Sequence, residues 1–149
     1  MSAPQSVPVQ IRIGPHSGGD ANPDDHYVCH GQAGEYKLEA AYFVPAKAVA
    51  AHSTNYYSFQ LEQGFEGTST AISDALTTAS TAMAVGTVRE FTLTDNTSRE
   101  FGPTDILFCD LDEAGTASQN IEGYIIARFV KVRVKWPLSG TLGPPSSLC

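Results

Sequence analysis

The feature that most constrains this chain is a two-residue alternation of apolar and polar side chains. In the first such run, Val7, Val9, Ile11 and Ile13 occupy every second position. Because successive side chains of a strand point to opposite faces, this spacing predicts a strand with one buried face. Similar runs follow, separated by Gly, Pro, Asn and Asp, which favour turns. The sequence therefore predicts an all-β fold.

Seven segments have this strand pattern, namely 7–13, 26–30, 36–44, 56–61, 88–94, 105–109 and 123–136. Segment 45–55 permits a single helical turn after Pro45. Segment 68–84 is rich in Ala, Ser and Thr, and it stays open between a short helix and an irregular strand. Because no sustained helical period occurs, the strand spacing predicts an antiparallel β-sandwich or barrel.

The length of 149 residues argues for one domain. We expect an N-terminal arm and loop at 1–25, a β-sandwich body at 26–136 and a C-terminal arm at 137–149. Gly and Pro are frequent in both end segments, which is typical of loops and extended arms. No apolar run approaches the roughly 18 to 20 residues that cross a bilayer, and the start lacks the pattern of a signal peptide. We therefore expect a soluble protein, made in a cytoplasm, with no membrane partner.

The charge of the chain is unevenly placed. Nine Lys and Arg stand against 16 Asp and Glu, a formal charge of −7, which argues against a nucleic-acid partner. The last four basic residues, Arg128, Lys131, Arg133 and Lys135, have no acidic residue after them. This basic strip has two interpretations. It steers association with another protein or copy, or it is solvated charge on an edge strand.

No set of residues predicts a metal or cofactor site. His26 and His30 share a strand face but lie about 13 Å apart at about 3.3 Å per residue, too far for one ion. The cysteines, Cys29, Cys109 and Cys149, include no close pair, and the first two are expected to be small buried hydrophobes. We therefore expect no metal, no cofactor and no disulfide framework.

No arrangement typical of catalysis is found either. The chain lacks a Gly-x-Ser-x-Gly elbow, and Gly18-Gly19 opens no helix as a phosphate loop requires. His52 and Ser53 are adjacent, so their side chains are not expected to face each other. Paired acids such as Asp24 and Asp25 fall in predicted turns, where solvated carboxylates are normal. We expect that the protein is not an enzyme.

Several segments, in this order, resemble a pattern in small head proteins of tailed bacteriophages. They are AAYFVP at 40–45 with Ala48-Val49, STNYYSFQL at 53–61, FTLT at 91–94, GPTDIL at 102–107, EAGTA at 113–117 and GYIIARF at 123–129. The resemblance covers about residues 37–129. The chain departs from the family form in two turns. Pro103-Thr104 lies between Gly102 and Asp105, and Ala117 replaces the last Gly of Gly-Thr-Gly.

The resemblance implies a capsid decoration, or cement, protein. Such a protein is a β-sandwich, usually a homotrimer, that sits on the outer capsid surface and clamps neighbouring subunits of the major capsid protein. We accordingly expect a virion protein of a bacteriophage head, synthesised in the host cytoplasm. Its expected partners are the major capsid protein and other copies of itself. The segments 1–25 and 131–149 lie outside the shared pattern.

Two groups of residues are candidates for the interface. Val7, Val9 and Ile11 belong to a strand that either adds to the sheet of a neighbour or is an ordinary strand of its own sheet. The basic strip, Arg128, Lys131, Arg133 and Lys135, ends beside Trp136. Trp136 is either an interface anchor or the residue that closes the core.

Other functions remain open on the sequence alone. One alternative is a head-fibre base or a tail-associated structural module. Another is a carbohydrate-binding virion adhesin that uses Tyr56 and Tyr57, although a strand would place one of these in the core and the other on the surface. A small hydrolase is the weakest of these alternatives.

Overall fold

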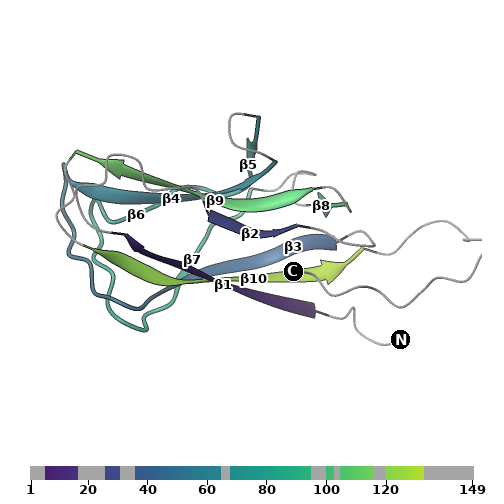
Figure 1. Cartoon of the computed structure of the whole chain (residues 1–149), viewed down its shortest axis with the longest axis horizontal. Helices are drawn as coiled ribbons and strands as arrows, with labels where there is room; N and C mark the ends of the chain where they lie inside the picture. The colour runs from purple at the N-terminus through teal and green to yellow at the C-terminus, as the bar shows by residue number, and fades with distance from the viewer. Residues whose placement is uncertain are drawn as a thin grey trace, which may run out of the picture.

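The computed structural model of the chain describes residues 6–16, 26–30, 36–64, 68–94, 100–102, 105–115 and 120–132. These residues form two antiparallel sheets that face each other as two layers (Figure 1). The predicted β-sandwich is therefore confirmed. Within the described ranges, no helix has the length and apolar character needed to span a membrane.

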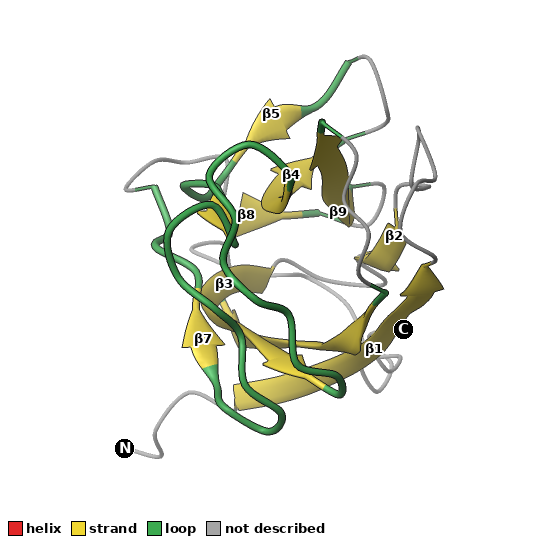
Figure 2. Ribbon diagram, turned by 90° about the vertical axis from the view of Figure 1, so that its left-hand side faces the viewer, coloured by secondary structure: helices red, strands yellow, loops and turns green. Residues whose placement is uncertain are grey.

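We call the two layers sheet A and sheet B. Sheet A has the order β1 (Ser6–His16), β10 (Ile121–Lys131), β3 (Tyr36–Pro45) and β7 (Arg89–Glu90), and β8 (Glu100–Phe101) also pairs with β3. Sheet B has the order β2 (His26–His30), β9 (Ile106–Ala114), β4 (Tyr56–Gln63) and β5 (Thr70–Ala71), and β6 (Leu76–Thr77) also pairs with β4. The edge strands β1 and β2 lie close together on one side of the sandwich (Figure 2).

The core lies between the two sheets and is rich in aromatic side chains. Phe43 on β3 and Phe59 on β4 are both 0% exposed, and their ring centroids are 4.7 Å apart, so they join sheet A to sheet B. Phe101 and Phe129 meet edge to face at 5.5 Å. Such aromatic pairs contribute about 0.5–1.5 kcal/mol beyond the burial of their area. The inner faces therefore account for the packing of the two layers.

The alternation of inward-facing residues along β3 shifts by one position partway along the strand. Arg128 pairs with Ala40, whereas the next residue, Phe129, pairs with Leu38, so Glu39 is an extra residue, as in a β-bulge. Before this point Leu38 is inward, and after it Ala41 is inward, both at 0% exposure. The bulge leaves the Glu39 side chain exposed on the surface.

Segment 68–84 is irregular strand, which decides the question that its sequence left open. It runs along the edge of β4 and contains only the short strands β5 and β6. Two buried hydroxyl groups accept hydrogen bonds from backbone N–H groups of β4. Ser73 Oγ accepts a hydrogen bond from Leu61 N at 2.9 Å, and Thr78 Oγ1 accepts one from Tyr57 N at 3.0 Å. At these two positions, Ser and Thr hydroxyls take the place of backbone acceptors.

One expected boundary differs from the structure. The segment 1–25 was expected to be an arm before the body, but Ser6–His16 is β1 and pairs with β10. Ile13 is 0% exposed and Val9 is 7% exposed, so hydrophobic burial places β1 in the sandwich. The expected body and arm beyond Val132, at 133–149, and the rest of the N-terminal segment, at 1–5 and 17–25, lie outside the described residues.

Two expected local structures are also corrected. Segment 88–94 is not a continuous strand, since only Arg89–Glu90 pairs as β7 and Val88 is 56% exposed. Segment 45–55 contains no helical turn. Instead, Val49 and Met83 exchange backbone hydrogen bonds of 2.9 and 2.8 Å, which hold this loop against the loop that precedes β7.

Candidate interaction surface

The described residues contain no group of three or more His, Cys, Asp or Glu side chains arranged to hold a metal ion. Cys109 is 0% exposed, which confirms its expected role as a small buried hydrophobe. Cys149 and the side chains of Cys29, His26 and His30 lie outside what the structure describes. The features that distinguish one region of the surface from another are found on the outer faces of the two sheets.

The outer face of sheet A carries a row of half-buried apolar side chains, which we call the outer strip. Its members are Tyr42, Val44, Tyr124, Ile126 and Val130. Tyr42 on β3 is the register partner of Ile126 on β10, and Val44 is the partner of Tyr124. Directly paired side chains on one face of a sheet lie close enough to touch. Tyr42, Val44, Tyr124 and Ile126 therefore form a continuous apolar surface across the two central strands of sheet A, and Arg128 separates Val130 from it on β10.

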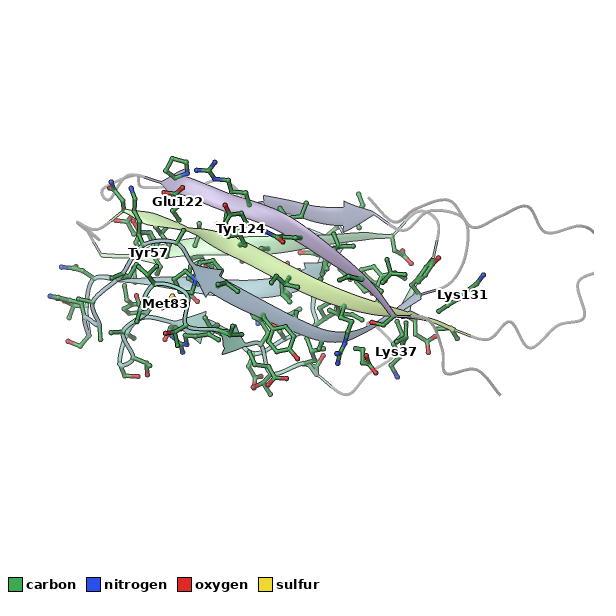
Figure 3. All side chains as sticks on the ribbon, turned by 90° about the horizontal axis from the view of Figure 1, so that it is seen from below. Lys37, Tyr57, Met83, Glu122, Tyr124 and Lys131 are labelled. Carbon is green, nitrogen blue, oxygen red and sulfur yellow. The ribbon has the colours of Figure 1, made fainter. Side chains whose placement is uncertain are left out.

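An ion-pair cluster lies at one end of the outer strip, where Figure 3 shows Glu122 beside Tyr124. Arg12 on β1 hydrogen-bonds the Glu122 carboxylate, and Lys47 Nζ lies 3.6 Å from Glu122 Oε2. The hydrogen bond from Arg12 lowers the pKa of Glu122. Partial desolvation opposes this, and attraction to Arg12 and Lys47 lowers the pKa further. Glu122 is therefore held as a carboxylate.

The opposite end of sheet A carries three cations, Lys37, Arg128 and Lys131, which we call the basic end. Lys37 and Lys131 lie at the same end of the sheet in Figure 3. Arg128 Nε lies 2.9 Å from Glu39 Oε2, and both side chains are about half exposed, at 46% and 48%. An exposed pair of this kind contributes about 0–1 kcal/mol to stability. The arrangement therefore presents charge at the surface and adds little to folding.

The outer face of sheet B has a different composition. Its central positions pair polar with acidic side chains, since Ser58 faces Asp112 and Gln60 faces Asp110. The strands of sheet B contain four acidic residues and no Lys or Arg. Every Lys and Arg in the described ranges lies on sheet A or in the loop after β3: Arg12, Lys37, Lys47, Arg89, Arg128 and Lys131. Sheet A also carries four acidic residues, Glu39, Glu90, Glu100 and Glu122, so its strands are nearly balanced in charge, whereas the strands of sheet B are acidic.

The apolar side chains on the outward positions of β9 are already covered. Phe108 is 4% exposed and Ile106 is 6% exposed. The members of the outer strip are less buried than these residues. Sheet A is therefore the layer whose outer apolar side chains remain accessible.

The first group of expected interface residues, Val7, Val9 and Ile11, forms part of the sandwich. Val9 lies in the core, and Val7 and Ile11 pack against it. Their strand pairs with β10, so the interpretation of β1 as an ordinary strand of its own sheet is the one that holds. The alternation that made these side chains conspicuous points them inward, and Val7 and Ile11 remain partly exposed on the edge strand of sheet A.

The second group is placed only in part. Arg128 and Lys131 lie at the basic end, whereas Arg133, Lys135 and Trp136 lie outside the described residues. The sequence reasoning missed the outer strip. The signal was present in the run Gly123-Tyr124-Ile125-Ile126-Ala127, where apolar residues occupy both faces of the strand instead of alternating.

The residues of two other hypotheses are also placed. Tyr57 is 1% exposed and Tyr56 is half-buried, which confirms the interpretation of one core and one surface residue. The His52 ring does not form a pair with Ser53 in the described contacts. Its Nδ1 accepts a hydrogen bond from Asn55 N at 3.0 Å and thereby stabilises a turn.

No family model, no curated protein and no solved structure matches this chain. The fold assignment rests on the strand pairing described above. A functional proposal rests on the surface of the sandwich and on the resemblance of the ordered segments.

Proposed function

We propose that this protein is a decoration, or cement, protein of a tailed-bacteriophage head. It binds the outer surface of the capsid as a homotrimer and stabilises the contacts between subunits of the major capsid protein. The observation that carries the proposal is the outer face of sheet A, where accessible apolar side chains lie between an ion-pair cluster and a basic end. The resemblance of the segments within 37–129 supplies the identity of the partner.

The composition of the outer face of sheet A supports a protein partner. Protein interfaces combine an apolar centre with a polar and charged rim. The outer strip provides such a centre, and the cluster around Glu122 and the basic end provide such a rim. An accessible apolar surface that crosses two strands is typical of an interaction site.

The sandwich itself is suited to a clamp. Cross-sheet packing, as between Phe43 and Phe59, resists deformation, so contacts on the surface are held at fixed positions. Three copies on one lattice site multiply weak contacts into strong binding. Arg133, Lys135 and Trp136 follow Lys131 in the sequence, so the proposal keeps them as candidate contact residues.

The proposal assigns a structural role, with no catalytic residue, cofactor or metal. The protein resides in the virion, on the outer surface of the capsid, after synthesis in the host cytoplasm. Its partners are the major capsid protein and two further copies of the chain.

The test is to add the purified protein to capsids that lack it. We expect saturable binding and a higher temperature of capsid disruption. Absence of binding would contradict the proposal, and binding to glycans but never to capsids would favour the adhesin. The mass in solution tests the trimer separately, because a protein that stays monomeric in solution and on capsids would contradict it.

The basic end is tested with a pair of matched variants. The double variant Lys37→Gln/Lys131→Gln and the control Ser53→Glu/Thr87→Glu each make the chain more negative by two charges, and all four positions are surface positions. We expect the first to weaken capsid binding about fivefold and the second to change it little. Equal effects would mean that only the net charge matters.

A further inference from the structure

We infer that the outer strip of sheet A is the surface that lies against the capsid, and that sheet B faces the solvent. The partner surface that fits is apolar at its centre and acidic where it meets Lys37 on the outer face and Lys131, which is exposed at the end of β10. This inference rests on the proposed function for the identity of the partner and for the trimer. It adds the orientation of the sandwich and the chemistry of the contact.

The first argument is the difference in desolvation between the two outer faces. Covering the outer strip removes the remaining accessible area of half-buried side chains such as Tyr124 and Ile126 from water, which is favourable. Covering the outer face of sheet B would desolvate the carboxylate of Asp112, which is exposed, and burying a charge is unfavourable unless the partner compensates it. Sheet A is therefore the layer whose outer face is covered at the lower free energy.

The second argument is charge. The strands of sheet A carry five cations and four acidic residues, whereas the strands of sheet B carry four acidic residues and no cation. An acidic partner surface attracts the basic end and repels the outer face of sheet B. The basic end is continuous with the outer strip along β10, because Ile126, Arg128 and Val130 alternate on one face of that strand. A single partner surface can therefore contact both the outer strip and the basic end.

The third argument is symmetry, which argues against the two face-to-face contacts of the outer strip with a second copy. A contact between the outer strips of two copies has two-fold symmetry and makes a dimer, not a trimer. A contact between the outer strip and sheet B of the next copy joins opposite sides of the sandwich (Figure 1). Such a contact repeats in one direction without closing, so it makes a filament. Neither of these two arrangements forms the proposed trimer, whose contact joins two different surfaces of neighbouring copies.

Tyrosine footprinting tests this orientation without any substitution. Hydroxyl radicals modify accessible tyrosines, and mass spectrometry measures the extent at each position. Tyr42 and Tyr124 lie on sheet A, whereas Tyr56 begins β4 of sheet B, and all three are half-buried in the single chain. On capsids, we expect modification of Tyr42 and Tyr124 to fall severalfold relative to the free protein and that of Tyr56 to stay unchanged.

Each outcome decides between named alternatives. If the protein binds capsids and Tyr56 is protected instead, or no tyrosine is protected, the orientation is wrong while the proposed function stands. If the free protein already protects Tyr124, and dilution restores its modification, a second copy covers the outer strip. If Tyr124 is protected in the free protein at every dilution, the chain covers its own strip. Both results overturn the inference, and absence of capsid binding overturns the proposed function itself.

A pair of variants gives an independent test. Ile126→Lys places a charge in the outer strip, and the control Val88→Lys makes the same kind of change at a loop position that is 56% exposed. We expect Ile126→Lys to weaken capsid binding about tenfold or more and Val88→Lys to leave it unchanged. Equal binding by a folded Ile126→Lys variant would overturn the inference. If that variant does not fold, the footprinting of the unmodified chain decides.

Discussion

Sheets A and B have similar inner faces and dissimilar outer faces. Inside, both contribute fully buried aromatic and aliphatic side chains, such as Phe43 from sheet A and Phe59 from sheet B. Outside, sheet A presents the outer strip and the basic end, whereas sheet B presents Ser, Gln, Asp and Glu side chains. The inner faces are similar because both bury apolar side chains away from water. The difference outside shows which layer is suited to a partner.

The largest expected effect tests the equivalence of the two inner faces. Phe43→Ala and Phe59→Ala each remove a buried ring from one side of the same contact. We expect each to lower the free energy of unfolding by about 3–5 kcal/mol, measured by urea denaturation. Because the rings touch, the double variant should lose less than the sum of the single losses. A loss near zero for either variant would contradict the shared core.

A smaller effect tests how closely sheet A is packed on its inner side. A Cβ at position 123 would lie 2.6 Å from Phe43 Cζ and 2.6 Å from Val44 O. We therefore expect Gly123→Ala to lower the free energy of unfolding by about 1–3 kcal/mol. Ser58→Thr adds a methyl group on the outer face of sheet B and should change stability little. If the two substitutions have equal effects, the close approach at Gly123 is not a constraint.

The buried hydroxyl at the edge of sheet B provides the next test. Thr78→Val keeps the shape of the side chain but removes the acceptor of Tyr57 N. We expect a loss of about 1–3 kcal/mol in the free energy of unfolding, because a buried N–H is left without its acceptor. Thr78→Ser retains the hydroxyl and should lose less. A larger loss in Thr78→Ser than in Thr78→Val would contradict this role.

The smallest effect concerns pH and the outer side of sheet A. The pKa of Glu122 is lowered in the folded chain, mainly by the hydrogen bond from Arg12. Its ionised form therefore stabilises the fold above the ordinary carboxyl pKa, and this contribution is lost as the pH falls through the lowered value. Glu122→Gln should be slightly less stable than the original chain at pH 7, and the two should converge in acid. A difference in stability between the two chains that grows as the pH falls would contradict this role of the Glu122 carboxylate.

Alternation was sufficient to predict the regular part of the fold. Segment 26–30 matches β2, and 36–44 matches β3 to within one residue, because turn residues bound these runs. The bulge at Glu39 was not predictable, since it depends on pairing with β10. The path of 68–84 depends on hydrogen bonds to β4 that have no local signature.

The candidate site was predicted less well than the fold. The basic residues Arg128 and Lys131 were found from charge alone, and they lie at the surface. Val7, Val9 and Ile11 were chosen because their alternation was clear, and that alternation is the reason they face the core. Tyr124 and Ile126 were missed because an apolar run without alternation is equally typical of a strand buried on both faces. Only the cross-strand register places them on the accessible side.

The measurement that tests the account most directly is an electron cryo-microscopy map of capsids incubated with the protein. The account predicts three copies of a two-layered density around a symmetry axis, with β1, β10 and β3 nearest the shell and β4 and β9 outermost. A shell without added density would contradict the proposed function, and density with sheet B against the shell would contradict the assignment of sheet A as the contact layer.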